Sequence, residues 1–232
     1  MAKTNVWSVV VAGGSGSRFG RLKQYSLLAG RPVLEHAVQA CRPWSHGVVL
    51  VVPDDDNGDG DGDRNPHGAN AVVTGGATRA DSVRCGLAAV PTDAQVIVVH
   101  DAARPLASPG LFDSVIRAVT EGGADGAVPG LTPSDTIKVV DDKGEVTSTL
   151  DRRSLVAVQT PQAFRAEVLR RAHQQGHPVA PGATAATDDA MLVEALGGRV
   201  HVVPGEPGNL KITTPQDLRT AERLLAGDAD RS

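Results

Sequence analysis

The chain has 232 residues and a formal net charge of −4, from 23 basic and 27 acidic residues. Its hydrophobic fraction of 41% is ordinary for a globular protein and excludes a disordered tail. No apolar run approaches the ~20 residues of a membrane span, and the N-terminus lacks the charged and apolar regions of a signal peptide. The acidic balance, with only two Trp, one Tyr and three Phe, argues against general nucleic-acid binding. We therefore expect neither a nucleic acid nor a membrane as partner.

The first half of the chain alternates short apolar strands with helical patterns. The predicted strands cover residues 8–12, 48–52, 71–74, 96–99 and about 127–128, and the predicted helices cover 32–41, 81–90 and 109–121. Unbroken β-branched runs separated by helices favour a mostly parallel sheet flanked by helices on both faces. Ligands of such α/β folds bind in the loops at the carboxyl ends of the strands.

Residues 132–160 interrupt this alternation. Two extended runs, 135–140 and a second that reaches Val156, flank a turn at 141–144, which predicts an inserted β-hairpin, or arm. A protruding arm commonly embraces a second subunit, and a plain surface hairpin is the alternative. After the arm we expect helices from about 166, at 188–196 and at 215–225, and a strand at 200–203. The chain as a whole, 1–232, is expected to form one domain.

Residues 54–63 contain six aspartates and no basic residue. From Asp55 the segment resembles the first half of an EF-hand loop, but Pro66 stands where the bidentate glutamate belongs. We therefore expect a solvated connection rather than a calcium site. Without this segment the chain has 21 acidic and 23 basic residues, so its bulk acidity does not exclude a local anion site.

The two cysteines, Cys41 and Cys85, lie within helical patterns and have no second cysteine at metal-ligand spacing. We expect both to be small buried residues in a reduced cytoplasm.

A glycine-rich loop, 12–20, follows the first predicted strand and carries Arg18, with Lys23 just beyond it. Glycines let backbone N–H groups approach a polyanion closely. The dinucleotide fingerprint fails because Phe19 occupies its third glycine position, and the P-loop pattern fails because Lys23 is followed by Gln24. The loop predicts a phosphate site of another kind, with a tight turn and solvated cations as the alternative.

A second cluster, His100-Asp101-Ala102-Ala103-Arg104-Pro105, follows the predicted strand 96–99. A carboxylate at a strand end beside a phosphate loop can hold Mg²⁺ on a nucleotide, so Asp101 is a candidate metal ligand. The alternative is an Asp101–Arg104 salt bridge that only fixes the turn. We interpret His100 as a structural hydrogen-bonding residue rather than a base.

Motifs along the chain, taken together, resemble the family of 2-C-methyl-D-erythritol 4-phosphate cytidylyltransferases. They lie at residues 12–18, 23–25, 75–76, 79–83, 100–105, 135–138, 159–162, 187–190 and 211–213. The resemblance implies a homodimer with a Rossmann-like nucleotidyltransferase core and a β-arm that contributes to the partner's site. It also implies transfer of a cytidylyl group from CTP to methylerythritol phosphate, with release of pyrophosphate and with Mg²⁺ as cofactor.

The resemblance also implies roles for individual residues. Arg18 and Lys23 would stabilise the transition state, and Arg152 on the arm and Lys211 would hold methylerythritol phosphate in line. The remaining substrate-lining residues would be Asp101, Arg104, Thr136 and Thr160. The nucleotide would be bound by Ala12, Gly13, Gly14, Ser15, Gly16, Gly76 and Ser82.

The chemistry agrees with these residue types. A phosphate monoester is largely dianionic near neutral pH and needs no general base, so the lack of a Ser-His-Asp or Cys-His pattern is expected. The obstacle is repulsion between two anions, which cations, Mg²⁺ and enforced in-line approach overcome. Alternatives are a ribitol-5-phosphate cytidylyltransferase, a non-catalytic nucleotide-binding protein on the same fold, and, less favoured, a dinucleotide oxidoreductase.

Overall fold

The structure of the chain is a computed structural model that describes residues 4–13, 23–53, 67–175 and 186–229. Four residues of the predicted phosphate loop, Gly14, Ser15, Gly16 and Arg18, lie outside the described residues, as does the acidic segment 54–63. Lys23 is described for its backbone only.

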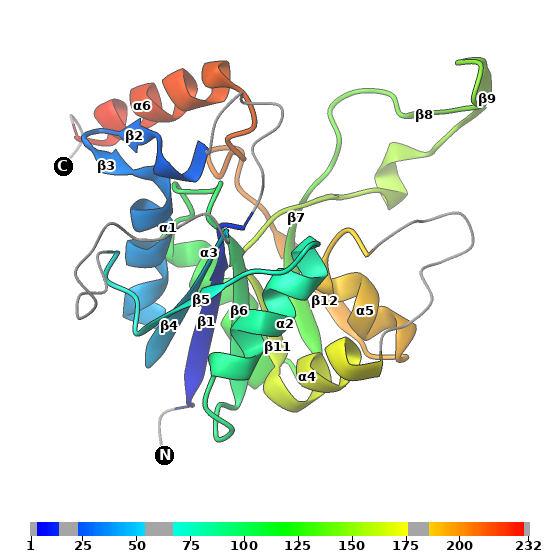
Figure 1. Cartoon of the computed structure of the whole chain (residues 1–232). Helices are drawn as coiled ribbons and strands as arrows, with labels where there is room; N and C mark the ends of the chain where they lie inside the picture. The colour runs from blue at the N-terminus through cyan, green and yellow to red at the C-terminus, as the bar shows by residue number, and fades with distance from the viewer. Residues whose placement is uncertain (1–3, 14–22, 54–66, 176–185, 230–232) are drawn as a thin grey trace.

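An eight-stranded sheet runs through the molecule in the order β10-β7-β11-β6-β1-β4-β5, with β12 also paired to β7 (Figure 1). Its strands are β1 (Val6–Val11), β4 (Gly47–Val52), β5 (Ala71–Thr74), β6 (Val96–Asp101), β7 (Gly126–Leu131), β10 (Ala157–Val158), β11 (Gln162–Arg165) and β12 (Val200–Pro204). The β1/β4, β1/β6, β4/β5 and β7/β12 pairs are parallel, whereas β11 runs antiparallel to both β6 and β7. The predicted mostly parallel α/β sheet is confirmed, and β11 is a strand that the sequence pattern did not predict.

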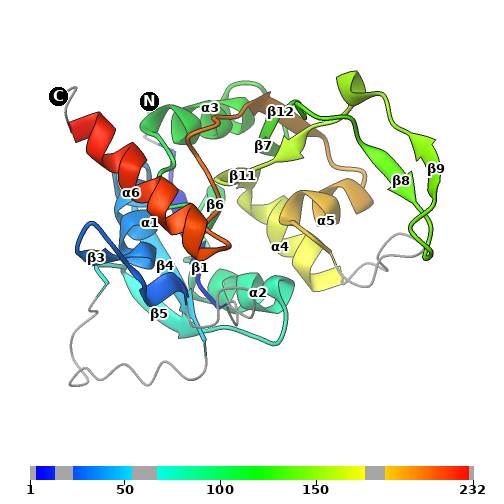
Figure 2. The ribbon, with the colours of Figure 1, turned by 90° about the horizontal axis from the view of Figure 1, so that it is seen from above.

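Helices cover both faces of this sheet (Figure 2). On one face lie α1 (Val33–Cys41) and α3 (Pro109–Thr120); on the other lie α2 (Arg79–Ala89), α4 (Ala166–Gln175) and α5 (Asp189–Ala195). Successive strand residues point to opposite faces, so Val9 packs with the second group of helices and Val10 with the first. Gly86 lets α2 lie close to the sheet, because a Cβ there would be 2.5 Å from Val9.

A smaller apolar cluster joins α6 (Pro215–Ala229) to α1 through Leu28, Val33, Ile212 and Ala221. This cluster positions the chain segment that precedes α6, and that segment returns to the carboxyl edge of the sheet. The short elements of the structure are η1 (Lys23–Tyr25), β2 (Leu27–Leu28), β3 (Arg31–Pro32), η2 (Arg42–Trp44) and η3 (Arg152–Ser154).

The predicted hairpin is present as β8 (Lys138–Val140) and β9 (Val146–Thr149), an antiparallel pair that forms its own two-stranded sheet. It projects away from the main sheet, and its residues are largely exposed (Figures 1 and 2). The strands are shorter than predicted, with a register shift at Val139/Val140. The final part of the predicted arm returns to the main sheet as β10.

Cys41 is buried and free, as expected, but Cys85 is free and only partly buried, so the expectation of a buried residue is wrong there. Among the residues described, no helix is both long and apolar enough to cross a membrane.

Candidate active site

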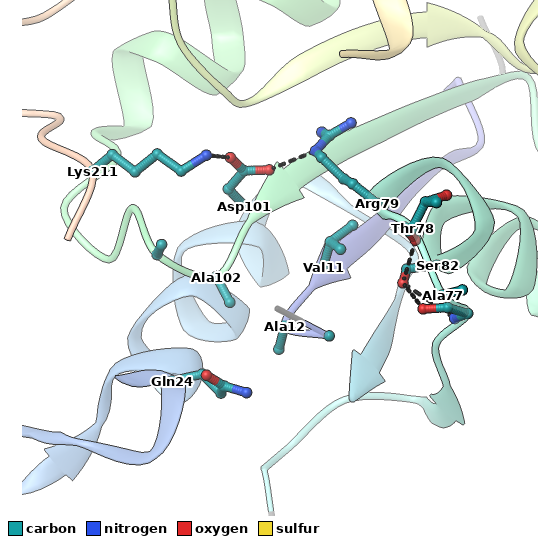
Figure 3. A pocket seen from close by; sticks show the side chains of 13 residues that line it. Val11, Ala12, Gln24, Ala77, Thr78, Arg79, Ser82, Asp101, Ala102 and Lys211 are labelled. Carbon is teal, nitrogen blue, oxygen red and sulfur yellow. Dashed lines mark hydrogen bonds and ion pairs between the residues drawn. The ribbon is translucent and has the colours of Figure 1, made fainter. Parts of the chain in front are cut away.

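Two cavities meet at the carboxyl ends of β1 and β6. The larger has a volume of about 380 Å³, and the predicted site residues that line it are Ala12, Gly13, Gly76, Ser82, Asp101 and Lys211 (Figure 3). The smaller has a volume of about 210 Å³ and is lined by Arg104 and Thr160, among others. Three residues line both cavities: Arg79, Asp101 and Lys211. The structure thus brings together eight of the predicted site residues.

The residues shared by both cavities form a row of ion pairs that is drawn in Figure 3. Asp101, the last residue of β6, accepts from Lys211 Nζ at 2.6 Å on Oδ2 and from Arg79 Nε at 3.2 Å on Oδ1. Burial alone would raise the pKa of Asp101, but the adjacent Arg79 and Lys211 hold it well below its ordinary value. Asp101 is therefore a carboxylate at any physiological pH, and both of its oxygens are engaged by cations.

Arg79 is fixed from behind by a second buried carboxylate. Arg79 Nη1 lies 2.7 Å from Oδ2 of Asp189, and the other oxygen of Asp189 lies 2.9 Å from His173 Nε2. A carboxylate can only accept, so His173 donates from Nε2. Burial raises the pKa of Asp189, but Arg79 and the His173 hydrogen bond together bring it below its ordinary value. A chain of polar contacts thus runs from α4 through α5 and α2 to the end of β6.

His100 is a structural residue, as predicted. Its Nε2 lies 3.0 Å from the carbonyl of Arg104, which can only accept, so Nε2 carries the proton. Nδ1 then accepts from Thr160 Oγ1, 3.1 Å away, and Thr160 Oγ1 accepts from Asp101 N at 3.0 Å. Burial lowers the pKa of His100 to about 4, which agrees with this neutral tautomer.

The Asp101–Arg104 salt bridge, considered as an alternative from the sequence, is not what the structure contains. Asp101 pairs instead with Arg79 and Lys211, and Arg104 Nη1 donates to the carbonyl of Asn209 at 2.7 Å. Burial lowers the pKa of Arg104 from its ordinary value. The Arg104 side chain is therefore held at the edge of the smaller cavity by a neutral group.

On the opposite wall of the larger cavity, Ser82 fixes the backbone around two glycines. Ser82 Oγ donates to the carbonyl of Thr78 at 3.0 Å and accepts from Gly76 N at 3.2 Å. A Cβ on Gly75 would lie 2.7 Å from Ser82 Oγ, and one on Gly13 would lie 3.1 Å from it. A side chain at Gly75 would therefore displace Ser82, and one at Gly13 would make a tight contact with it.

The donor set at this site suits Mg²⁺ only in part. In the described part of the chain there is no group of three or more His, Cys, Asp or Glu residues that could hold a metal ion. Mg²⁺ on a nucleotide is commonly held by one or two carboxylates, phosphate oxygens and water, so the single carboxylate of Asp101 fits that chemistry. Each of its two oxygens accepts one hydrogen bond, from Arg79 or from Lys211, and keeps a second lone pair that could bind the ion.

Two predicted site residues lie apart from the cavities. Thr136 and Arg152 are exposed on the arm, where Arg152 Nη1 donates to the carbonyl of Ser134 at 2.7 Å. Neither lines the cavities formed by its own chain. The side chains of Arg18 and Lys23, together with Gly14, Ser15 and Gly16, lie outside the described residues.

Sequence reasoning missed several residues that build the site. Arg79 and Asp189 lie within the motifs 79–83 and 187–190 that carry the family resemblance, but the sequence did not identify either as an ion-pair partner at the site. Gln159 and Asn209, both buried, were also given no role. The sequence gives little indication of these residues, because each bonds to partners far away in the chain; Arg79 and Asp189, for example, are 110 residues apart.

Comparison with known proteins agrees with these observations. A model of the 2-C-methyl-D-erythritol 4-phosphate cytidylyltransferase family matches residues 6–227. The enzyme of that name from Rubrobacter xylanophilus is 43% identical over 227 residues, covering 94% of both chains. A bifunctional IspD/IspF enzyme from Anaeromyxobacter dehalogenans is 45% identical, and the match spans 95% of this chain but only 57% of that protein.

Solved structures give the same result. The crystal structure of a 2-C-methyl-D-erythritol 4-phosphate cytidylyltransferase from Thermus thermophilus superposes with a TM-score of 0.74 at 36% identity, covering 94% of this chain and 97% of that one. A 4-diphosphocytidyl-2C-methyl-D-erythritol synthase from Anaerococcus prevotii gives a TM-score of 0.77 at 28% identity, covering 96% and 99%. The chain is thus a member of the 2-C-methyl-D-erythritol 4-phosphate cytidylyltransferase family.

Proposed function

We propose that this chain transfers a cytidylyl group from CTP to 2-C-methyl-D-erythritol 4-phosphate, releasing pyrophosphate and forming 4-diphosphocytidyl-2-C-methyl-D-erythritol, a step in non-mevalonate isoprenoid biosynthesis. The observation that carries the proposal is the row Arg79–Asp101–Lys211, which lines two adjoining cavities in a chain of this family. Two anionic substrates placed in the two cavities would meet at this row.

The nucleotide would occupy the larger cavity, held by backbone and small side chains. The proposed nucleotide contacts are Ala12, Gly13, Gly14, Ser15, Gly16, Gly76 and Ser82. The monoester would occupy the smaller cavity beside Asp101, Arg104, Thr160 and Lys211. Because a phosphate monoester is already a nucleophile, the residues need only align it with the α-phosphorus and neutralise charge as the bond to pyrophosphate breaks. Lys211 is suited to this role because its side chain is 41% exposed and its ammonium contacts Asp101 at the cavity, where it could bind a phosphate instead.

Arg18 and Lys23 are proposed to stabilise the charge that develops on the phosphates in the transition state. Asp101 is the residue proposed to hold Mg²⁺, which when bound neutralises phosphate charge. The cytoplasmic location expected from the two cysteines stays a prediction, as does the organisation of residues 1–232 as one domain with the arm inserted.

We also propose a homodimer in which each arm brings Arg152 and Thr136 to the partner's site. Two features support it. Among the residues that the structure describes, Arg152 and Thr136 line neither of the two cavities at the carboxyl ends of β1 and β6. The arm also exposes a row of apolar side chains that a partner could bury: Val139, Val140, Val146, Leu150 and Val156, each at least 40% exposed.

Turnover with defined substrates tests the proposal. The purified chain with CTP, Mg²⁺ and methylerythritol phosphate should release pyrophosphate, and ribitol 5-phosphate should replace methylerythritol phosphate poorly. Release with ribitol 5-phosphate alone would favour the alternative cytidylyltransferase. CTP binding without release from either polyol phosphate would favour a non-catalytic nucleotide-binding protein.

A further inference from the structure

A buried pair of amide side chains, Gln159 and Asn209, lies at the wall of the smaller cavity, which Gln159 lines. Asn209 is fully buried and Gln159 is 6% exposed. Gln159 is the residue after β10, at the point where the arm rejoins the sheet. Asn209 lies in the segment that leads to Lys211, so the pair joins two parts of the chain that are 50 residues apart.

The hydrogen bonds between these parts use both ends of the Gln159 amide. Gln159 Nε2 donates to the carbonyls of Glu206 at 2.9 Å and Asn209 at 3.3 Å. Gln159 Oε1 accepts from Glu206 N at 3.1 Å and from Asn209 Nδ2 at 3.4 Å. Asn209 Nδ2 also donates to the carbonyl of Thr160 at 2.9 Å. We name this set of contacts the Gln159–Asn209 clasp.

The clasp contacts two of the residues proposed to bind the polyol phosphate, Arg104 and Thr160, and is connected to a third, Asp101, through Thr160. The Asn209 carbonyl accepts from Arg104 Nη1 at 2.7 Å. The Asn209 side chain holds the backbone of Thr160, whose hydroxyl bonds to His100 and to Asp101 N. Lys211 lies two residues after Asn209. No comparable contact connects the clasp to Gly76 or Ser82 among the described hydrogen bonds.

We propose that Gln159 and Asn209 are positioning residues for the polyol phosphate, acting through Lys211, Arg104 and Thr160, and that they leave the nucleotide site unaffected. Asn209 is fully buried, and Gln159, which borders the smaller cavity, has both ends of its amide bonded within the clasp. Their role is to set the distance between the arm's base and the segment 206–211. This inference rests on the proposed function. Its physical basis is that a buried amide left without partners forces the surrounding backbone to shift, and a small shift misaligns in-line attack.

The test uses isosteric variants. Asn209→Asp removes both donors of Asn209, and Gln159→Glu removes both donors of Gln159. We expect the KM for methylerythritol phosphate to rise at least about tenfold while the KM for CTP stays within about twofold. Gln159→Met, which buries no charge, is the substitute if either variant is insoluble. Asn5→Asp, which loses donors to Asp93 at the opposite edge of the sheet, is the matched control and should change neither KM.

A second readout does not depend on turnover. Backbone amides of residues 205–214 should exchange hydrogen faster in the clasp variants than in Asn5→Asp, because Ile212 N, bonded to the Ala103 carbonyl at 2.8 Å, is anchored in the same segment. Equal rises of both KM values, or unchanged KM and exchange, would overturn the proposal. Inactivity of the unmodified chain with either polyol phosphate would instead overturn the proposed function, and the exchange experiment would still test the clasp.

Discussion

Two aspartate–arginine pairs in this chain have the same N–O distance, 2.7 Å, and opposite surroundings. Asp189 and Arg79 lie beneath the site, with side chains 1% and 25% exposed. Asp151 and Arg153 lie on the arm, 53% and 87% exposed. Water screens the exposed Asp151–Arg153 pair, so this pair adds little to the free energy of unfolding. Loss of one partner from the Asp189–Arg79 pair would leave a buried charge without its counter-charge.

The same contrast holds for the two regions as a whole. The carboxyl edge of the sheet satisfies its own charges: Asp101, Asp189, Arg79 and Lys211 neutralise one another. The arm exposes apolar residues and Arg152 with little of its own chain to bury them. The ion pairs at the carboxyl edge are formed within the chain, whereas the exposed apolar side chains of the arm would be buried only against a second surface.

The largest effect is expected at the cation that the two cavities share. Lys211→Met should lower kcat/KM for methylerythritol phosphate by about 10²–10³-fold, since charge stabilisation by one group is of that size. Stability should fall less than in Asp189→Asn, because Lys211 is 41% exposed and Asp101 keeps Arg79 as a partner. Steady-state kinetics with Arg117→Met as a remote exposed control measures this, and retention of wild-type kcat/KM would remove Lys211 from the site.

The two ion pairs of equal N–O distance should contribute very differently to the free energy of unfolding of the chain. Asp189→Asn should lower the free energy of unfolding by about 3 kcal/mol, because Arg79 and His173 lose a buried anion. Asp151→Asn on the arm should have no measurable effect. Urea unfolding of both variants tests the contrast, and equal losses would show that burial is not what separates the pairs.

His100 should make stability depend on pH. Its pKa in the folded chain, about 4, lies below its ordinary value of 6.5, so between these values the unfolded chain binds a proton that the folded chain does not. Its contribution is fully present above pH 6.5 and falls as the pH falls toward 4. At pH 5 we expect a loss of about 2 kcal/mol relative to pH 7. In His100→Gln this part of the pH dependence should vanish, whereas exposed His201→Gln should retain it; an unchanged slope in His100→Gln would contradict the assignment.

The smallest effect on chain stability is expected on the arm. Val140→Ser combined with Val146→Ser should leave the unfolding of the chain unaltered, because both side chains are more than half exposed. The double variant should dimerise more weakly than the unmodified chain, and sedimentation velocity over a range of concentrations would detect the difference. An unaltered dimer would show that this part of the arm is an ordinary surface hairpin.

Much of the fold was predictable because unbroken β-branched runs signal a parallel sheet. The strand β11 was not, since its four residues, Gln162–Arg165, follow Pro161 directly and run into α4 without a turn. Its burial depends on β6 and β7, which flank it, rather than on a local alternation.

The position of the site was predictable from the sequence, but its ion pairs and hydrogen bonds were predictable only in part. The rule that ligands bind at strand carboxyl ends placed Asp101 and Gly13 correctly beside one cavity. The sequence offered nearby Arg104 as an alternative partner for Asp101, but its partners Arg79 and Lys211 are 22 and 110 residues away. Such contacts depend on the packing of α2 and of the segment before α6, which no local pattern encodes.

In the proposed dimer, a working site combines Lys211 of one chain with Arg152 of its partner. The direct test is a heterodimer of one Lys211→Met chain and one Arg152→Ala chain, purified through two different tags. Each homodimeric variant should be nearly inactive, while the heterodimer, which has one intact site and one doubly defective site, should recover about half of the wild-type turnover. If Arg152 instead serves its own chain, both sites of the heterodimer remain defective, and a heterodimer as inactive as its parents would contradict the account.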